Sequence, residues 1–133
     1  MVMLDTDTCS ELVMGDTQLF SRIDSLDRDS WCISSLVFAE LQFGLEKGKL
    51  NPRSRDSLQK FLGSAPCVAF DCAAAREGAM VRGELEKLGR PANQMDYLIA
   101  GHARSLGSTL VTGNTRHFEN VGGLRVENWI STR

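Results

Sequence analysis

The sequence predicts an α/β domain with a mainly parallel central sheet flanked by helices. Short apolar runs alternate along the chain with longer segments whose apolar residues recur at helical spacing. The 133 residues, 42% hydrophobic and 24% charged, suit one domain with a buried core. No repeat, low-complexity tract or linker interrupts the pattern, so we expect a single domain over residues 1–133.

The first half of the chain is expected to hold two strands separated and followed by helices. The apolar run 2–4 ends at Asp5, and hydroxyl residues suited to helix caps come next, followed by apolar residues at mixed helical spacing. A second strand is expected at 31–33. A helix over 36–48 follows, because its apolar positions recur every four residues and Gly48 provides a natural end.

The second half continues the alternation and ends at the edge of the sheet. Its helices carry apolar residues on one side, and two of them stop at glycines. In chain order we expect a helix over 53–62, a strand over 67–70, helices over 71–88 and 93–106, a buried strand over 109–112 and an edge strand over 124–126.

Charge and hydropathy narrow the possible functions only slightly. The net charge of −2 is unlike the basic balance of many nucleic-acid-binding domains, so an RNA-binding role would need a local basic patch. No window of about 20 residues is free of charge, and no signal peptide is visible, so we expect a cytoplasmic protein without a membrane partner.

Three acids stand where chemistry is plausible. Asp5 directly follows a strand, where parallel sheets place their ligand sites, although it is also suited to be a plain helix cap. Glu40 lies among apolar residues of the 36–48 helix, and its alternative is an exposed position on the helix edge. Asp96 lies in the first turn of a helix, where it would also complement the helix dipole.

Separated carboxylates with oxygen-bearing neighbours are the ligands that Mg²⁺ or Mn²⁺ prefers. Such an ion lowers the pKa of a bound water and stabilises charge on a reacting phosphate. Three isolated acids are a weak signal until an order and a context connect them.

Five sequence blocks supply that order. They are M-L-D-T-D-T-C at 3–9, I-S-S-L-V-F-A-E-L-Q-F-G at 33–44, D-Y-L-I-A-G-H-A at 96–103, L-V-T-G-N-T-R-H-F at 110–118 and L-R-V-E-N-W at 124–129. In this order, over essentially the whole chain, they resemble the PIN-domain family and, within it, the toxin ribonucleases of VapBC toxin–antitoxin systems. The resemblance implies a three-layer PIN-like fold and metal-dependent endonucleolytic cleavage of RNA.

The resemblance also implies roles for individual residues. Asp5, Glu40 and Asp96 fall on acidic positions of the family, with Asp5 and Asp96 as metal ligands and Glu40 binding metal or orienting water. The fourth acidic position of many relatives falls on Asn114, which carries no charge. Asp7 replaces the usual asparagine and is expected to cap a helix or support the site from behind, which would restore a negative charge nearby.

Supporting and RNA-binding residues follow from the same comparison. Thr112 is expected to hydrogen-bond a carboxylate or a metal-bound water, and His117 stands where relatives often carry another acid. Four arginines are candidates for phosphate contacts, or else ordinary solvated surface: Arg82, Arg90, Arg104 and Arg116.

The family likeness further implies a substrate and partners. Relatives with this N-T-R-x-F block include toxins that cut initiator tRNA in its anticodon loop and so inhibit translation. A homodimer is expected, together with a small VapB-like antitoxin that blocks the acids and forms a hetero-oligomer. Apolar residues of the early helices are candidates for its docking, or else core: Leu12, Val13, Leu19, Phe20 and Phe43.

Two other functions remain open from the sequence. The D-T-D-T run fits the opening motif of haloacid-dehalogenase-type phosphatases, in which Asp5 would be the nucleophile and Asp7 the general acid/base. That fold also needs an acid pair in a later loop, and the loop that follows 110–111 offers none. The second alternative is a catalytically weak PIN-like module that binds RNA or protein, which Asn114 keeps open.

Overall fold

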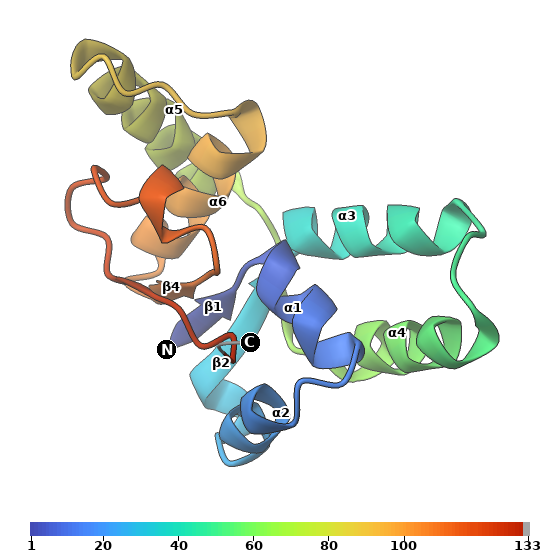
Figure 1. Ribbon diagram of the computed structural model, residues 1–133. Coiled ribbons are helices and arrows are strands. Elements are labelled where there is room, and N and C mark those ends of the chain that lie inside the picture. Colours follow the sequence, from blue (N-terminus) through green and yellow to red (C-terminus); the bar gives the residue numbers. More distant parts are fainter. Residues whose placement is uncertain (132–133) are drawn as a thin grey trace.

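A computed structural model describes residues 1–131, in which five short strands form one parallel sheet (Figure 1). The strand order is β3-β2-β1-β4-β5, and each neighbouring pair runs parallel. The strands are β1 (Val2–Leu4), β2 (Trp31–Ser34), β3 (Cys67–Val68), β4 (Thr109–Val111) and β5 (Val126–Glu127).

Helices cover both faces of this sheet. Helices α1 to α4 group on one side and α5 and α6 on the other (Figure 1), as right-handed crossovers require when the chain first moves one way along the sheet and then the other. The α-helices are α1 (Thr6–Val13), α2 (Thr17–Asp24), α3 (Ser35–Glu46), α4 (Pro52–Ser64), α5 (Cys72–Lys87) and α6 (Gln94–Ser105). Short 3₁₀ helices occur at Arg28–Ser30 and Thr115–His117. The predicted three-layer α/β architecture is therefore confirmed.

Element boundaries differ from the prediction where side chains compete for the backbone. The third strand stops at Val68 instead of residue 70, because the Phe70 N–H donates to Ser35 Oγ rather than to a neighbouring strand. The last strand lies at 126–127 instead of 124–126, in register with Leu110 and Val111. Within the described residues, no helix combines the length and apolar character that crossing a bilayer needs.

The strand order reverses around β1, which lies between β2 and β4. Such a reversal opens a crevice beyond the carboxyl ends of the two strands, because their connections leave in opposite directions. Leu4 pairs with Val111, and the Asp5 N–H donates to the Val111 carbonyl at 2.9 Å. The residues that follow β1 and β4, Asp5 and Thr112, are therefore brought side by side at this crevice.

Close packing of α5 against α6 sets the position of the helix that carries Asp96. Gly101 of α6 lies against the backbone of Gly78 in α5, and a Cβ at position 101 would overlap that backbone and approach the Glu77 carbonyl carbon to 2.7 Å. Both glycines are buried. The small residue at 101 is therefore what lets the two helix backbones meet.

We predict that Gly101→Ala lowers the free energy of unfolding by at least about 2 kcal/mol, because two helix backbones must separate to admit the methyl group. Gly83→Ala, on the exposed face of α5 with nothing within 4 Å of the new Cβ, is the matched control and should stabilise by up to about 1 kcal/mol. Urea denaturation of both variants measures the difference. Equal midpoints would contradict the packing described here.

Candidate active site

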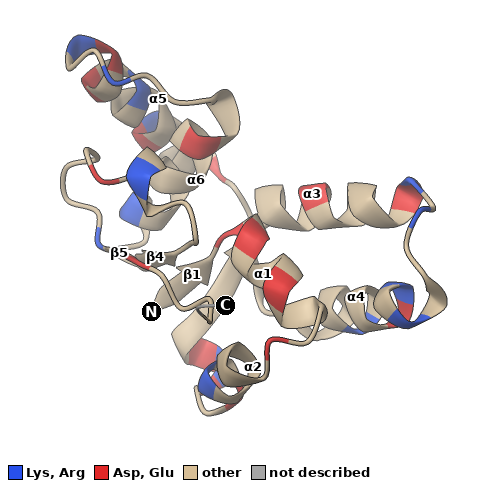
Figure 2. Cartoon of the chain, in the orientation of Figure 1, with Lys and Arg blue, Asp and Glu red and all other residues tan. Residues whose placement is uncertain are grey.

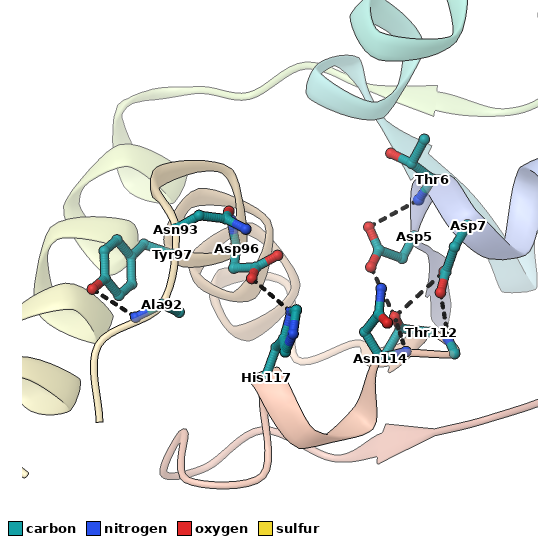
Figure 3. Close-up of polar contacts among 11 residues, drawn as sticks. Asp5, Thr6, Asp7, Ala92, Asn93, Asp96, Tyr97, Thr112, Asn114 and His117 are labelled. Carbon is teal, nitrogen blue, oxygen red and sulfur yellow. Dashed lines mark hydrogen bonds and ion pairs between the residues drawn. The ribbon is translucent and has the colours of Figure 1, made fainter. Parts of the chain in front are cut away.

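Asp5 joins the end of β1 to the start of α1 and is 7% exposed. Its Oδ1 accepts from the Thr6 N–H at 2.8 Å, and its Oδ2 accepts from Thr112 Oγ1 at 2.8 Å (Figure 3). Asp5 is thus the N-cap of α1, which was one interpretation of its position in the sequence. It also lies at the crevice beyond the strand ends, which was the other interpretation. The two roles coincide because the cap uses one carboxylate oxygen and Thr112 holds the other.

The ionisation of Asp5 is opposed by its surroundings. Burial raises the pKa of its carboxyl from 3.8 to about 6, against the hydrogen bonds from Thr112 and Thr6, which lower it, and the nearby charges of Asp7 and Asp96 raise it further. A buried acid with other acids facing it is stabilised as the carboxylate by a cation. The pKa of Asp5 is raised mainly by burial, and the charges of Asp7 and Asp96 contribute less.

Asp7 lies against the turn that follows β4. Its Oδ2 accepts from the Gly113 N–H at 2.9 Å, and its Oδ1 lies 3.4 Å from Thr112 Oγ1. Asp5, rather than Asp7, caps α1, so the expected capping role of Asp7 is wrong. Asp7 instead lies behind Asp5, against the turn that follows β4. Its carboxylate brings negative charge to the turn that carries Asn114.

Glu40 reaches the site from the second turn of α3. It is exposed, as the helix-edge alternative held, although its neighbours along the chain are largely apolar. Its Oε1 accepts from Thr6 Oγ1 at 2.7 Å, so α1 and α3 are joined at the rim of the crevice. Thr6 is a site residue that the sequence reasoning treated only as a possible helix cap.

Asp96 faces the crevice from the first turn of α6. Asn93 caps this helix by accepting the Asp96 N–H at 2.8 Å, and the Asp96 side chain is 15% exposed. Its Oδ2 lies 3.0 Å from His117 Nδ1, and the ring is directed toward the carboxylate (Figure 3). Burial raises the pKa of Asp96, His117 lowers it, and the charges of Glu40 and Asp7 raise it. Asp96 therefore lies within electrostatic range of Asp5, Glu40 and Asp7.

The turn after β4 places Asn114 beside these acids. Its backbone N–H donates to Thr112 Oγ1 at 3.1 Å, and its side chain lies next to Thr112 (Figure 3). Thr112 is buried and donates to Asp5, so it fixes both the turn and the carboxylate. The hydroxyl at 112 thus does the supporting work that the sequence indicated.

Acidic residues from several elements gather around the carboxyl edge of the sheet (Figure 2). The atoms that their side chains offer to a metal ion are all carboxylate oxygens. Among residues 1–131, no group of three or more His, Cys, Asp or Glu side chains is drawn together closely enough to hold an ion. Thr6 hydrogen-bonds Glu40, and His117 contacts Asp96. Hard oxygen donors around a buried carboxyl nevertheless fit a divalent cation such as Mg²⁺.

The candidate arginines divide into two kinds. Arg104 is 13% exposed, forms ion pairs with Glu77 and Glu84, and donates to the Gly122 carbonyl. The guanidinium of Arg104 is therefore already used in joining α6 to α5 and to the Gly122 carbonyl. The expected contact of Arg104 with an RNA phosphate is wrong.

The other three arginines are exposed. Arg82 pairs with Glu86 and reaches Gln94, so much of its hydrogen-bonding capacity is also used. Arg90 and Arg116 both line a pocket that includes Asp96. These two remain the stronger candidates for phosphate contacts.

The fold and the acidic crevice together define the class of small α/β metal-dependent nuclease domains. The PIN domain family matches residues 2–124. The chain is 39% identical over 127 residues to the "tRNA(fMet)-specific endonuclease VapC" of Shigella flexneri and 33% identical over 129 residues to "Ribonuclease VapC2" of Haemophilus influenzae, covering at least 96% of each chain. The DNA-bound VapBC structure from Salmonella typhimurium superposes with a TM-score of 0.86 at 34% identity, covering 97% of this chain and 99% of that one.

The chain therefore belongs to the PIN-domain family, among the VapC endoribonucleases of VapBC toxin–antitoxin systems. The haloacid-dehalogenase interpretation is wrong, because the family match spans both Asp5 and Asp7 in a different fold. In the structure Asp7 hydrogen-bonds a backbone amide instead of standing free as an acid/base.

We predict that the metal-free protein loses stability as pH rises from about 4 to about 6. The native state keeps the Asp5 proton to higher pH than the unfolded chain, so the unfolded state binds fewer protons in this window and the free energy of unfolding falls. Asp5→Asn removes this titration and should be more stable than wild type above pH 6 by about 1–3 kcal/mol. Denaturation in a chelator across this range measures the difference, and parallel curves for the two proteins would contradict it.

Proposed function

We propose that this ribonuclease hydrolyses initiator tRNA in its anticodon loop with the help of Mg²⁺ or Mn²⁺ bound at Asp5 and Asp96. The observation that carries the proposal is the meeting of acids from β1, α3 and α6 at the point where the strand order reverses. The tRNA assignment is supported by relatives from Shigella flexneri and Salmonella typhimurium named tRNA(fMet)-specific endonucleases.

The chain's own residues would position the reactants. Thr112 hydrogen-bonds Asp5 and His117 contacts Asp96, so both carboxylates are held at the site. Glu40, exposed at the rim and hydrogen-bonded by Thr6, would bind the cation or orient the attacking water and accept its proton. When bound, the cation neutralises charge on the phosphate and makes the water more acidic.

Asn114 would contribute an amide oxygen or a hydrogen-bond donor on the far side of the crevice. It cannot supply the charge of an acid, and Asp7 brings a carboxylate to the same turn. Asp7 would then stabilise the cation by its negative charge, from a position fixed by its hydrogen bond with the Gly113 N–H.

The partner we propose is a small VapB-like antitoxin, as in the VapBC complexes to which this chain is similar. Residues of α1, α2 and α4, together with Trp31 of β2, line two adjoining pockets of about 290 and 420 Å³ with a largely apolar surface: Leu12, Val13, Phe20, Ile23, Trp31 and Phe61. Leu19 is fully buried and belongs to the core, so its expected docking role is wrong. We further propose a cytoplasmic, single-domain protein that dimerises and forms a hetero-oligomer with the antitoxin.

Substitution of the acids tests the proposal against the catalytically weak alternative. We predict that Asp96→Asn and Asp5→Asn each lower the rate of initiator tRNA cleavage by at least about a thousandfold, because each removes a metal-binding charge. Asp56→Asn, which breaks only an exposed ion pair with Lys60 on α4, should stay within about twofold of wild type.

Cleavage is followed by gel electrophoresis of purified tRNA with Mg²⁺ or Mn²⁺, and thermal melting confirms that each variant folds. Full activity of both Asp5→Asn and Asp96→Asn would show that the chain does not cut RNA with these acids. Growth inhibition on expression provides a parallel readout in cells.

A further inference from the structure

A polar pocket of about 390 Å³ lies beside the acidic crevice. It is formed by the segment 90–93 before α6 and by the 3₁₀ helix Thr115–His117 with the residues after it. The pocket includes Asp96 and His117, whereas Asp5 and Glu40 are not part of its lining. It therefore extends the proposed cleavage site in one direction, away from β1.

The walls of this pocket are held by buried contacts. The Ala92 N–H donates to the hydroxyl of the buried Tyr97 at 2.9 Å, and Asn93 caps α6 (Figure 3). On the opposite wall, Phe118 is 1% exposed and anchors the 3₁₀ helix that carries Arg116. The loop 90–93 and the 3₁₀ helix that form the walls are thus each anchored by a buried side chain, Tyr97 and Phe118 respectively.

The two arginines of the pocket differ from Arg82 of α5 and Arg104 of α6. Arg90 and Arg116 are exposed, and neither forms an ion pair with another residue of the described chain, in contrast to Arg82 and Arg104. The lining also includes the carboxylates of Asp96 and Glu119, but neither forms an ion pair with Arg90 or Arg116 in the described chain. The two guanidinium groups are therefore available to bind a phosphate through paired N–H donors.

The rest of the lining suits the other parts of a nucleotide. Pro91 and the half-buried Ala92 offer an apolar surface for the face of an unstacked base, and Asn120 offers an amide for its edge. The volume falls in the range of pockets that enclose small ligands. The apolar pockets of α1, α2 and α4 share no lining residue with this one, so a protein partner has a separate surface.

We propose that this pocket binds one nucleotide of the RNA next to the phosphate that is cut, with its phosphate between Arg90 and Arg116. This proposal rests on the proposed ribonuclease function and defines a specificity subsite for it. Binding here places the neighbouring phosphate over Asp96, because the pocket and the crevice share that residue.

The test uses the double variant R90Q/R116Q, with R53Q as the matched control on α4, which lies far from α6 (Figure 1). Fluorescence anisotropy in a chelator, in the Asp5→Asn background, measures the Kd of an anticodon stem-loop RNA without cleavage. R90Q/R116Q should raise this Kd at least about tenfold. The slope of log Kd against log salt concentration should fall by about one to two, which corresponds to the loss of about one to two phosphate contacts. R90K/R116K should recover part of the affinity, and R53Q should stay within about twofold.

With Asp5 restored, R90Q/R116Q should raise KM and change kcat by no more than about twofold, since the contact is made equally to bound substrate and transition state. If wild type cuts RNA and R90Q/R116Q binds it as R53Q does, the subsite is refuted while the ribonuclease function stands. If wild type cuts no RNA yet R90Q/R116Q weakens binding, the function fails and the nucleotide pocket stands. If R90Q/R116Q binds RNA as wild type does but no longer binds a hexaglutamate peptide that wild type binds, the pocket belongs to a protein partner and the proposal is overturned.

Discussion

The buried carboxyl group of Asp5, at the end of the central strand, is the constraint on which the rest of the site depends. It caps α1 with one oxygen and accepts from Thr112 with the other, yet burial, and to a smaller extent the charges of Asp7 and Asp96, raises its pKa to about 6. Two hydrogen bonds fix where the group lies without neutralising it. A fold that retains such a group at a strand-order reversal is built to receive positive charge there.

The remaining elements serve to bring other acids to this point. The Gly101–Gly78 contact lets α6 pack closely on α5, and Arg104 adds ion pairs between the same helices, so Asp96 is carried on a well-anchored element. Glu40 comes from the opposite face of the sheet and is joined to α1 through Thr6. The Asp96 carboxylate is contacted by His117, which comes from the 3₁₀ helix after β4.

Much of the fold follows from the alternation of apolar runs and helical spacing, because both periodicities are local properties of the chain. The identity of Asp5, Glu40 and Asp96 also follows from their order in the five sequence blocks. Their surroundings do not, since the partners are remote in sequence: Thr6 meets Glu40 34 residues away, and Arg104 meets Glu77 27 residues away. The exposure of Glu40 and the satisfied guanidinium of Arg104 emerge only once the helices are packed.

The central claim is that these carboxylates bind a divalent cation, and Mn²⁺ binding tests it without reference to RNA. Electron paramagnetic resonance of free Mn²⁺, titrated with the purified protein at pH 7.5, measures occupancy directly. Wild type should bind Mn²⁺, and Asp5→Asn and Asp96→Asn should each weaken binding by at least about tenfold, while Asp56→Asn binds as wild type does. Equal binding by all four proteins, or none by wild type, would contradict the account.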